Sequence, residues 1–364
     1  MKKHILFQPF FVNIKLLEGI YFACRKFDMQ LSICQPGMKI HNIKSFDGLL
    51  SNSMEYAEEI HSKGGKAVCY SNLINEKSLL KFDACVASDE KKIGRIGAEY
   101  FLRKGFWNFA CSLDSLREQI FCENLQQAGQ NSIHCFDPKL VTKSGNMTRR
   151  IDFLKKLPKP CAFFVQTVHY WEYWHEAVSR AGLKDPEDLA IVTIDDLEYI
   201  CNLSAPTLSS IDTSNFEQGY RMCEVLSKLL DHEEVEPMTL IAPQPQVVER
   251  DSSDFYAVRN EKLRRIIRFS REHISERLSV SGLAKTFSLT MPALYQLFER
   301  HLRISPKRFL IELQLKRAKY LLTTGNSKME VVAAESGFTS LDSFFHFFRE
   351  YHNITPKEWC CRIR

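Results

Sequence analysis

The chain has 364 residues, 45% of them hydrophobic, which is enough for two or three domains with sizeable cores. No run of 18 apolar residues occurs, and Gln8, Pro9 and Asn13 interrupt the apolar start with no small-residue cleavage site after it, so we expect neither a membrane span nor export. The twelve cysteines include no C-x-x-C pair, which argues against zinc and disulfide frameworks and predicts reduced cysteines of a cytoplasmic protein.

The net charge of +5 is unevenly distributed along the chain. Residues 256–364 hold 20 Lys and Arg against 10 Asp and Glu, a net charge of +10, whereas the preceding residues hold 29 against 34, a net charge of −5. This asymmetry predicts a module that binds a polyanion, attached to a mildly acidic one. A basic face that is only solvated is the alternative that charge leaves open.

The first 250 residues alternate short apolar runs with helical periodicity, which predicts parallel sheets with helices on both faces. Two such units fit, one before and one after about Lys104. The expected strands lie at residues 4–10, 46–51, 66–71, 84–88, 106–112, 132–136, 161–166, 189–195 and 206–211. The expected helices lie at residues 14–27, 54–63, 91–104, 115–128, 147–157, 170–181 and 215–230.

Polar residues just after the expected strands are candidate site residues, because ligands of open parallel sheets bind at the carboxyl ends of the strands. None of these turns carries a G-x-G-x-x-G pattern or a P-loop, and no nucleophile–base pair or catalytic carboxylate spacing is found, so we do not expect an enzyme. The strand-end segments are residues 9–13, 51–53, 88–89, 112–115, 166–169 and 195–196.

A change in the sequence pattern marks a domain boundary. Residues 239–253 carry two prolines and no helical period, and after Glu261 the chain reads as short helices separated by Ser, Thr, Gly and Pro. We therefore predict a two-lobed α/β domain over residues 1–250, a linker over 251–258 and an all-α domain over 259–364.

Within the all-α domain, residues 278–302 predict a helix-turn-helix. A short helix over 280–287 is followed by a tight turn, and Thr290 and Pro292 suit the N-cap and first turn of a second helix. Leu294, Leu297 and Phe298 form its buried stripe, and the opposite faces can enter a major groove. The candidate DNA-contacting residues are Met291, Pro292, Tyr295, Gln296 and Arg300.

The pattern then recurs after a long helix expected over residues 307–322. A helix over 329–335, a turn at 337–339 and a helix over 341–351 form a second helix-turn-helix. At about 100° per residue, four aromatic residues of its second helix share one buried arc: Phe344, Phe347, Phe348 and Tyr351. The candidate DNA-contacting residues are Ser340, Leu341, Asp342, Phe345, His346 and Arg349.

These motifs resemble the C-terminal DNA-binding domain of the AraC/XylS transcription regulators. The resemblance covers about the last 105 residues and rests on RAKYLL at 317–322, GF at 337–338, FFHFF at 344–348 and ITPKEW at 354–359. It implies double-stranded DNA, a second copy of the chain and RNA polymerase as partners. Asn353, Asp342 and His346 stand where that family usually has Gly, Ser and a basic residue, so we expect the first unit to supply most of the base reading.

The first 250 residues resemble the periplasmic-binding-protein-like sensor of LacI-type regulators, without that family's DNA-binding headpiece. The segments that carry the resemblance are residues 87–111, 115–129, 189–196 and 206–254. It implies a monosaccharide effector, a pentose such as xylose or another sugar, and no cofactor.

In that family Arg117 would match an arginine that reaches sugar hydroxyls, and Asp195 an aspartate that accepts from them. A planar guanidinium and a fixed carboxylate together orient a polyol. An ion pair for Arg117 or a helix cap for Asp195 is the alternative. Gln166-Thr167 stands where the family usually has Asn-Asp or Thr-Asp, which leaves the recognised hydroxyl pattern open. The further candidate ligand residues are Gln166, Thr167, His169, Phe11 and Asn13.

Tyr170 and Trp171 follow the same strand end and either stack on a sugar or pack in the core. His169, Glu172 and Glu176 share a helix face, but without a second cluster we expect no metal site.

The leading hypothesis is a sugar-responsive transcription regulator in which the ligand changes the geometry of paired DNA-binding domains. From the family resemblance we expect it to activate transcription. The alternative is a ligand-independent DNA-binding protein whose first domain only dimerises.

Overall fold

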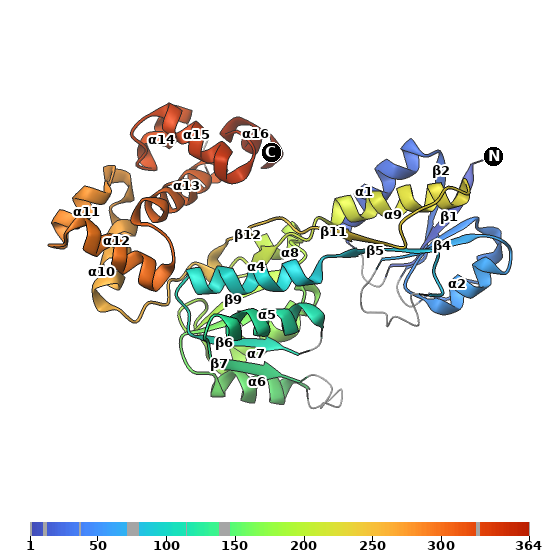
Figure 1. Ribbon diagram of the computed structural model, residues 1–364, viewed down its shortest axis with the longest axis horizontal. Coiled ribbons are helices and arrows are strands. Elements are labelled where there is room, and N and C mark those ends of the chain that lie inside the picture. Colours follow the sequence, from blue (N-terminus) through green and yellow to red (C-terminus); the bar gives the residue numbers. More distant parts are fainter. Residues whose placement is uncertain are drawn as a thin grey trace. The chain divides into compact units, whose positions relative to one another are not determined.

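The structure is a computed structural model that describes residues 2–9, 13–35, 38–70, 80–113, 115–137, 146–324 and 328–363 (Figure 1). It divides into two compact units: the first comprises Met1–Phe101 and Trp107–Phe255, and the second comprises Leu102–Phe106 and Tyr256–Arg364. Among the described helices, none combines the length and the apolar character that crossing a bilayer requires.

The first unit contains two six-stranded sheets. The first sheet is parallel in the order β11-β5-β4-β3-β1-β2. Its strands are β1 (Lys3–Phe7), β2 (Met29–Ile33), β3 (Gly48–Leu50), β4 (Lys66–Cys69), β5 (Ala84–Ser88) and β11 (Met238–Ile241). Its helices are α1 (Ile14–Lys26), α2 (Met54–His61) and α9 (Asn215–Leu230), with the 3₁₀ turn η1 (Ile43–Ser45).

The second sheet has the order β12-β10-β9-β8-β6-β7 and is parallel except for the β10–β12 pair. Its strands are β6 (Asn108–Ser112), β7 (Ser132–Phe136), β8 (Cys161–Phe164), β9 (Leu189–Ile194), β10 (Ser209–Ile211) and β12 (Val247–Val248). Its helices are α4 (Glu90–Arg103), α5 (Leu116–Gln127), α6 (Asn146–Lys156), α7 (Trp171–Ala181) and α8 (Glu198–Leu203). Buried residues of α6 and α7 share one core with this sheet, whereas Phe121 of α5 stacks on Phe164 of β8.

All nine expected strands are confirmed, and the expected division near Lys104 separates those of the first sheet from those of the second, but α4, α9 and β11 do not follow this division. The chain passes from the first sheet to the second after β5, since Gly97 of α4 packs against the ring of Phe164 in β8. It later returns, so that α9 and β11 complete the first sheet. Periodicity identified the segments but carries no information about which sheet each one joins, and it missed the edge strands β2, β11 and β12.

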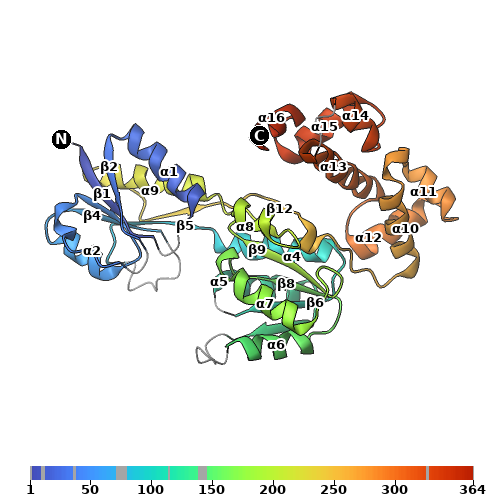
Figure 2. The same cartoon turned by 180° about the vertical axis from the view of Figure 1, so that it is seen from behind.

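Two glycines allow α1 and α9 to pack with their backbones in contact, and Figures 1 and 2 show these helices side by side. A Cβ atom on Gly19 would lie 2.0 Å from the carbonyl oxygen of Phe216, and one on Gly219 would lie 2.1 Å from that of Leu16. Any larger side chain at either position would force the helices apart.

The second unit is all-helical. Its helices are α10 (Glu261–Glu272), α11 (Val280–Thr286), α12 (Met291–Leu302), α13 (Pro306–Thr324), α14 (Met329–Glu335), α15 (Leu341–His352) and α16 (Pro356–Ile363), with the 3₁₀ turn η5 (Ile274–Glu276). Two hydrophobic cores share α13, which places Phe309 and Leu313 in one and Leu315 and Ala318 in the other. The repeated helix-turn-helix arrangement predicted from the sequence is thereby confirmed.

The aromatic stripe of α15 packs largely as predicted. Phe344 and Phe348 are fully buried in the second of these cores, whereas Phe347 and Tyr351 are half-buried and pack against its border.

The segment predicted as a linker is packed on both sides of residue 255. In the 3₁₀ turn η4 (Asp251–Ser253), the Ser252 hydroxyl donates to the Ile191 carbonyl at 2.8 Å, and both serines are fully buried. Tyr256 and Val258 are buried in the core of the second unit.

Candidate functional site

Polar side chains gather at the carboxyl edge of the second sheet. Strands β10, β9, β8 and β6 are neighbours, and parallel strands bring their carboxyl ends to one edge. Thr213 follows β10, Asp195 follows β9, Gln166 and Thr167 follow β8, and Arg117 lies in the first turn of α5 after β6. The structure therefore brings together four sequence-predicted residues from three separate segments.

Asp195 has a constrained backbone conformation, and its carboxylate accepts hydrogen bonds from two threonine side chains. Its φ of 82° is in the left-handed region that non-glycine residues rarely adopt. The hydroxyls of Thr167 and Thr213 donate to its two oxygens at 2.7 and 3.0 Å. A carboxylate has about four lone-pair sites, so about two remain for a ligand. The side chain does not cap a helix in this arrangement.

Arg117 forms a buried ion pair with Glu90, the first residue of α4. The side chains are 15% and 8% exposed, respectively. The Arg117 Nε and Nη2 groups donate to the Glu90 carboxylate, the latter at 2.7 Å, and Nη1 donates to the Gln166 carbonyl at 3.2 Å. Burial opposes the charge of Arg117, but Glu90 and Asp195 outweigh it and raise the pKa of Arg117 above its usual value. Three of five N–H donors are engaged in these contacts, which leaves two for a ligand.

Glu90 was missed by the sequence reasoning, although it directly follows the strand-end pair 88–89 that was singled out. The ion-pair alternative for Arg117 is therefore present in the structure. It does not exclude contact with a ligand, because the pair leaves donors unused.

His169 lies half-buried in the 3₁₀ turn η3 (Val168–Tyr170) next to this edge. Burial lowers the pKa of His169, and the neighbouring Asp195 charge only partly opposes this effect. The ring is thus neutral near pH 7, a form in which one nitrogen is a donor and the other an acceptor. Trp171 is 3% exposed and belongs to the core, so the core alternative holds for this residue.

Fewer of the predicted ligand residues lie at the first sheet than at the second. Asn13 is buried, and its side-chain oxygen caps α1 by accepting from the Leu16 amide at 3.1 Å, which leaves only its NH₂ group for a ligand. Phe11 lies outside the described residues. Sequence reasoning missed Gln8, which accepts from the Ser51 hydroxyl at 2.6 Å at the carboxyl ends of β1 and β3.

A charge cluster connects α1 to loops of the second sheet. Lys15 Nζ lies 3.5 Å from the carboxylates of Asp196 and Glu198 and 3.6 Å from that of Asp212. Burial opposes the charge on Lys15, but these three carboxylates outweigh it, so its pKa is raised. Asp196 is also paired with Arg250 at 2.8 Å. Lys15 and Asp212 line a separate pocket of about 1040 Å³ between α9 and β11, and this pocket includes neither Arg117 nor Asp195.

In the second unit, α12 begins as the sequence predicts. The Thr290 hydroxyl accepts from the Ala293 amide at 3.3 Å, and Pro292 lies in the first turn. All five candidate DNA-contacting residues of this helix are exposed: Met291, Pro292, Tyr295, Gln296 and Arg300. Side chains that contact the major groove of DNA must be exposed, and these are. Their contact with DNA stays a prediction.

The matching face of α15 is more mixed. Ser340 caps the helix by accepting from the Ser343 amide at 3.1 Å, and Leu341 and Phe345 are half-buried against the core. Asp342, His346 and Arg349 are exposed. The polar strip on α15 therefore holds an acid and one permanent base. Asn353, which stands where Gly is usual, ends the helix with a φ of 56°, a conformation that Asn tolerates better than most residues.

Two domain families match this chain. Residues 98–253 match the periplasmic binding protein-like domain, and residues 283–361 match the helix-turn-helix domain. The xylose operon regulatory protein of Haemophilus influenzae is 25% identical over 209 residues, which cover 57% of this chain and 54% of the relative. The chain thus spans about half the length of the curated relatives that it matches first.

Solved structures share the fold. The xylose-binding transcription activator XylR has a TM-score of 0.60 at 18% identity and covers 100% of this chain and 99% of its own. A LacI family transcriptional regulator from Enterococcus faecium with bound ribose has a TM-score of 0.56 at 16% identity and covers 69% of this chain and 98% of its own. These matched domains and named relatives are those of transcription regulators rather than enzymes.

Proposed function

We propose that this chain, in which an AraC-type helix-turn-helix domain follows a periplasmic-binding-protein-like domain, is a transcription regulator that responds to a monosaccharide. The observation that carries the proposal is the group of Arg117, Asp195 and His169 at the carboxyl edge of the second sheet. Arg117 and Asp195 each retain hydrogen-bonding capacity beyond their contacts within the protein.

A sugar complements this group chemically. Every hydroxyl both donates and accepts, so an oxygen that accepts from Arg117 can belong to a sugar whose neighbouring hydroxyl donates to Asp195. The names of the relatives mention xylose and ribose, so pentoses are the first ligands to test. Gln166 and Thr167 are neutral, whereas the sugar sensors that this domain resembles usually carry an aspartate at this strand end. We therefore infer that the recognised sugar has a pattern of hydroxyl groups different from that of xylose.

The DNA side of the proposal rests on the two helix-turn-helix cores and on the net charge of +10 over residues 256–364. The exposed face of α12 enters a major groove, and the strip on α15 contacts a second groove. The corresponding assembly is a cytoplasmic homodimer that binds a promoter of a carbohydrate-utilisation operon and contacts RNA polymerase. Its proposed effect is to activate transcription.

The ligand acts by favouring one arrangement of the sensor over another, since only a difference in affinity between two states can shift their populations. The Lys15 contacts with Asp196 and Asp212 are suited to this role, because they join α1 of the first sheet to loops of the second. A sugar that changes these contacts changes the geometry of the paired DNA-binding domains.

The test is thermal unfolding of the full chain against a pentose and hexose panel. A functional sensor is stabilised by at least one sugar, by RT ln(1 + [L]/Kd). Asp195→Asn should abolish that stabilisation while operator affinity is kept, and Glu217→Gln, an exposed change on α9, serves as the control. Stabilisation that survives in Asp195→Asn would remove this carboxylate from the site.

A ligand-independent regulator whose sensor only dimerises is the second candidate. The missing carboxylate at Gln166-Thr167 favours it. It predicts that no sugar of the panel raises the unfolding temperature, although the chain binds DNA and dimerises.

A further inference from the structure

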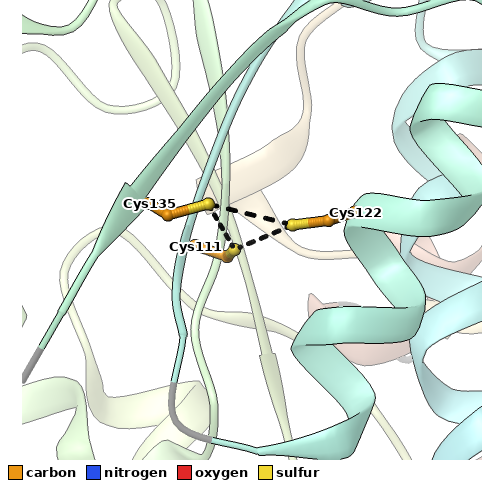
Figure 3. Close-up of side chains that lie close together, drawn as sticks. All are labelled: Cys111, Cys122 and Cys135. Atoms are coloured by element: carbon orange, nitrogen blue, oxygen red, sulfur yellow. Dashed lines mark hydrogen bonds between the residues drawn. The ribbon is translucent and has the colours of Figure 1, made fainter.

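Three cysteines from separate segments of the first unit converge on one face of the second sheet (Figure 3). Cys111 in β6 and Cys135 in β7 are register partners on adjacent parallel strands, and Cys122 of α5 lies over them. The Sγ atoms of Cys111 and Cys122 are 3.4 Å apart, and each lies 4.0 Å from that of Cys135. Within the described ranges, no other three His, Cys, Asp or Glu side chains hold their ligand atoms as close together.

The spacing of the sulfur atoms matches that of thiolates around one metal ion. With a metal–sulfur bond of about 2.3 Å, three thiolates in a plane stand about 4.0 Å apart, and three corners of a tetrahedron about 3.8 Å apart. Two of the three observed separations equal the planar value, and the third needs an adjustment of about 0.6 Å at most. A disulfide would instead require two sulfur atoms at about 2.05 Å.

The cluster is accessible from one side only. Cys111 is fully buried, Cys122 is half-buried and Cys135 is exposed, so an ion can enter past Cys135.

We propose that Cys111, Cys122 and Cys135 form a binding site for one thiophilic d¹⁰ metal ion, Zn²⁺ or Cu⁺. On binding, the S–H bonds of the three thiols are broken, the protons pass to solvent, and each thiolate donates an electron pair to the ion. Three protein ligands complete a planar site for Cu⁺, whereas Zn²⁺ takes a fourth ligand from solvent on the Cys135 side. The sequence did not indicate this site, because its ligands are 11 and 13 residues apart and are brought together by sheet register rather than by a short loop.

The site has a structural consequence for α5. The metal ties α5 to β6 and β7, and the same helix carries Arg117 in its first turn. An effect of metal on sugar affinity would rest on the proposed function, but metal binding itself does not.

The experiment uses the full chain, reduced with a phosphine and freed of metal. Titration with Cd²⁺, a spectroscopic substitute for Zn²⁺, should give a thiolate-to-metal charge-transfer band that saturates at one equivalent. Zn²⁺ and Cu⁺ are then titrated separately, Cu⁺ without oxygen, against chromophoric chelators to decide which ion binds more tightly. Cys122→Ser and Cys135→Ser should each weaken binding by about 100-fold or more.

Cys34→Ser is the matched control, because this partly exposed cysteine lies outside the cluster and should leave the titration unchanged. Cys135 is exposed, so its replacement tests the site even if Cys122→Ser disturbs folding. The proposal is overturned if no charge-transfer band forms at one equivalent, or if Cys135→Ser binds metal as tightly as Cys34→Ser. It is equally overturned if the reduced chain binds neither ion and oxidation yields a Cys111–Cys122 disulfide. None of these measurements depends on sugar or DNA.

Discussion

Removing Arg117 should destabilise the first unit strongly, because its partner Glu90 would be left charged and buried. The pair is 15% and 8% exposed, and Arg117 also donates to the Gln166 carbonyl. Breaking a buried ion pair by deleting one partner costs about 3–5 kcal/mol of the free energy of unfolding. Arg117→Ala should therefore lose about that amount, whereas an exposed pair contributes at most about 1 kcal/mol.

A double-mutant cycle isolates this effect. Replacing both partners with apolar residues, as in Glu90→Leu combined with Arg117→Met, leaves no unpaired charge and should cost less than the two single changes together. We expect a coupling free energy of about 2 kcal/mol or more. Arg221→Met on α9 is the control, because Arg221 is 45% exposed and its partners Glu217 and Glu224, one turn away on the same helix, are 50% and 20% exposed.

The assay is urea unfolding of the full chain monitored by tryptophan fluorescence. Trp107, Trp171 and Trp174 belong to the first unit and report its transition, whereas Trp359 belongs to the second. The reasoning is refuted if Arg117→Ala costs no more than Arg221→Met, or if the Glu90 and Arg117 changes are additive. A large loss would also mean that sugar binding must be compared among variants that remain folded, which is why Asp195→Asn is the better test of the ligand site.

The remaining predictions concern the second unit. Burial, with the Lys319 charge adding to it, lowers the pKa of His352 to about 3, below its unfolded value, so the unfolded chain takes up the proton first and stability falls as pH drops below about 6.5. Between pH 8 and pH 5 the loss should be at most about 2 kcal/mol and absent in His352→Leu; equal pH slopes in denaturation monitored at Trp359 would contradict this. Gly337→Ala should cost about 2 kcal/mol or more, because φ is +82° and the added Cβ would lie 2.0 Å from the Ile274 carbonyl oxygen. Gly129→Ala, with φ +77° and open space, should cost less, and similar losses in urea denaturation would rule out the clash. Gln296→Ala should change preference at one base pair by about 1–3 kcal/mol, whereas Arg300→Ala should weaken binding to every sequence and reduce the salt dependence. Binding titrations on operator variants at several salt concentrations check both, and a uniform loss for Gln296→Ala would remove its base-reading role.

Local patterns in the sequence were sufficient for most of the secondary structure. Alternation of apolar runs located the nine expected strands, and Thr290 and Pro292 marked the start of α12 because capping depends on residues within one turn. The angular positions of Phe344 and Phe348 on α15 identified them as core for the same reason.

The candidate sensor site was predictable only in part. Strand ends mark where polar groups collect, so Asp195 and the pair 166–167 follow from local patterns and from the resemblance to sugar sensors. The partners that restrain these residues are distant in sequence: Glu90 for Arg117, and Thr213 for Asp195. Nothing local to either residue identifies its partner.

The sequence by itself determined the kinds of element, their order and the basic character of the last third, because periodicity, capping and charge are properties of neighbouring residues. Only the tertiary structure decided that β11 and α9 complete the first sheet and that Glu90 neutralises Arg117. The same holds for the meeting of Cys111, Cys122 and Cys135. These outcomes depend on strand order and on the packing of helices over strands, which bring together side chains that no local spacing rule connects.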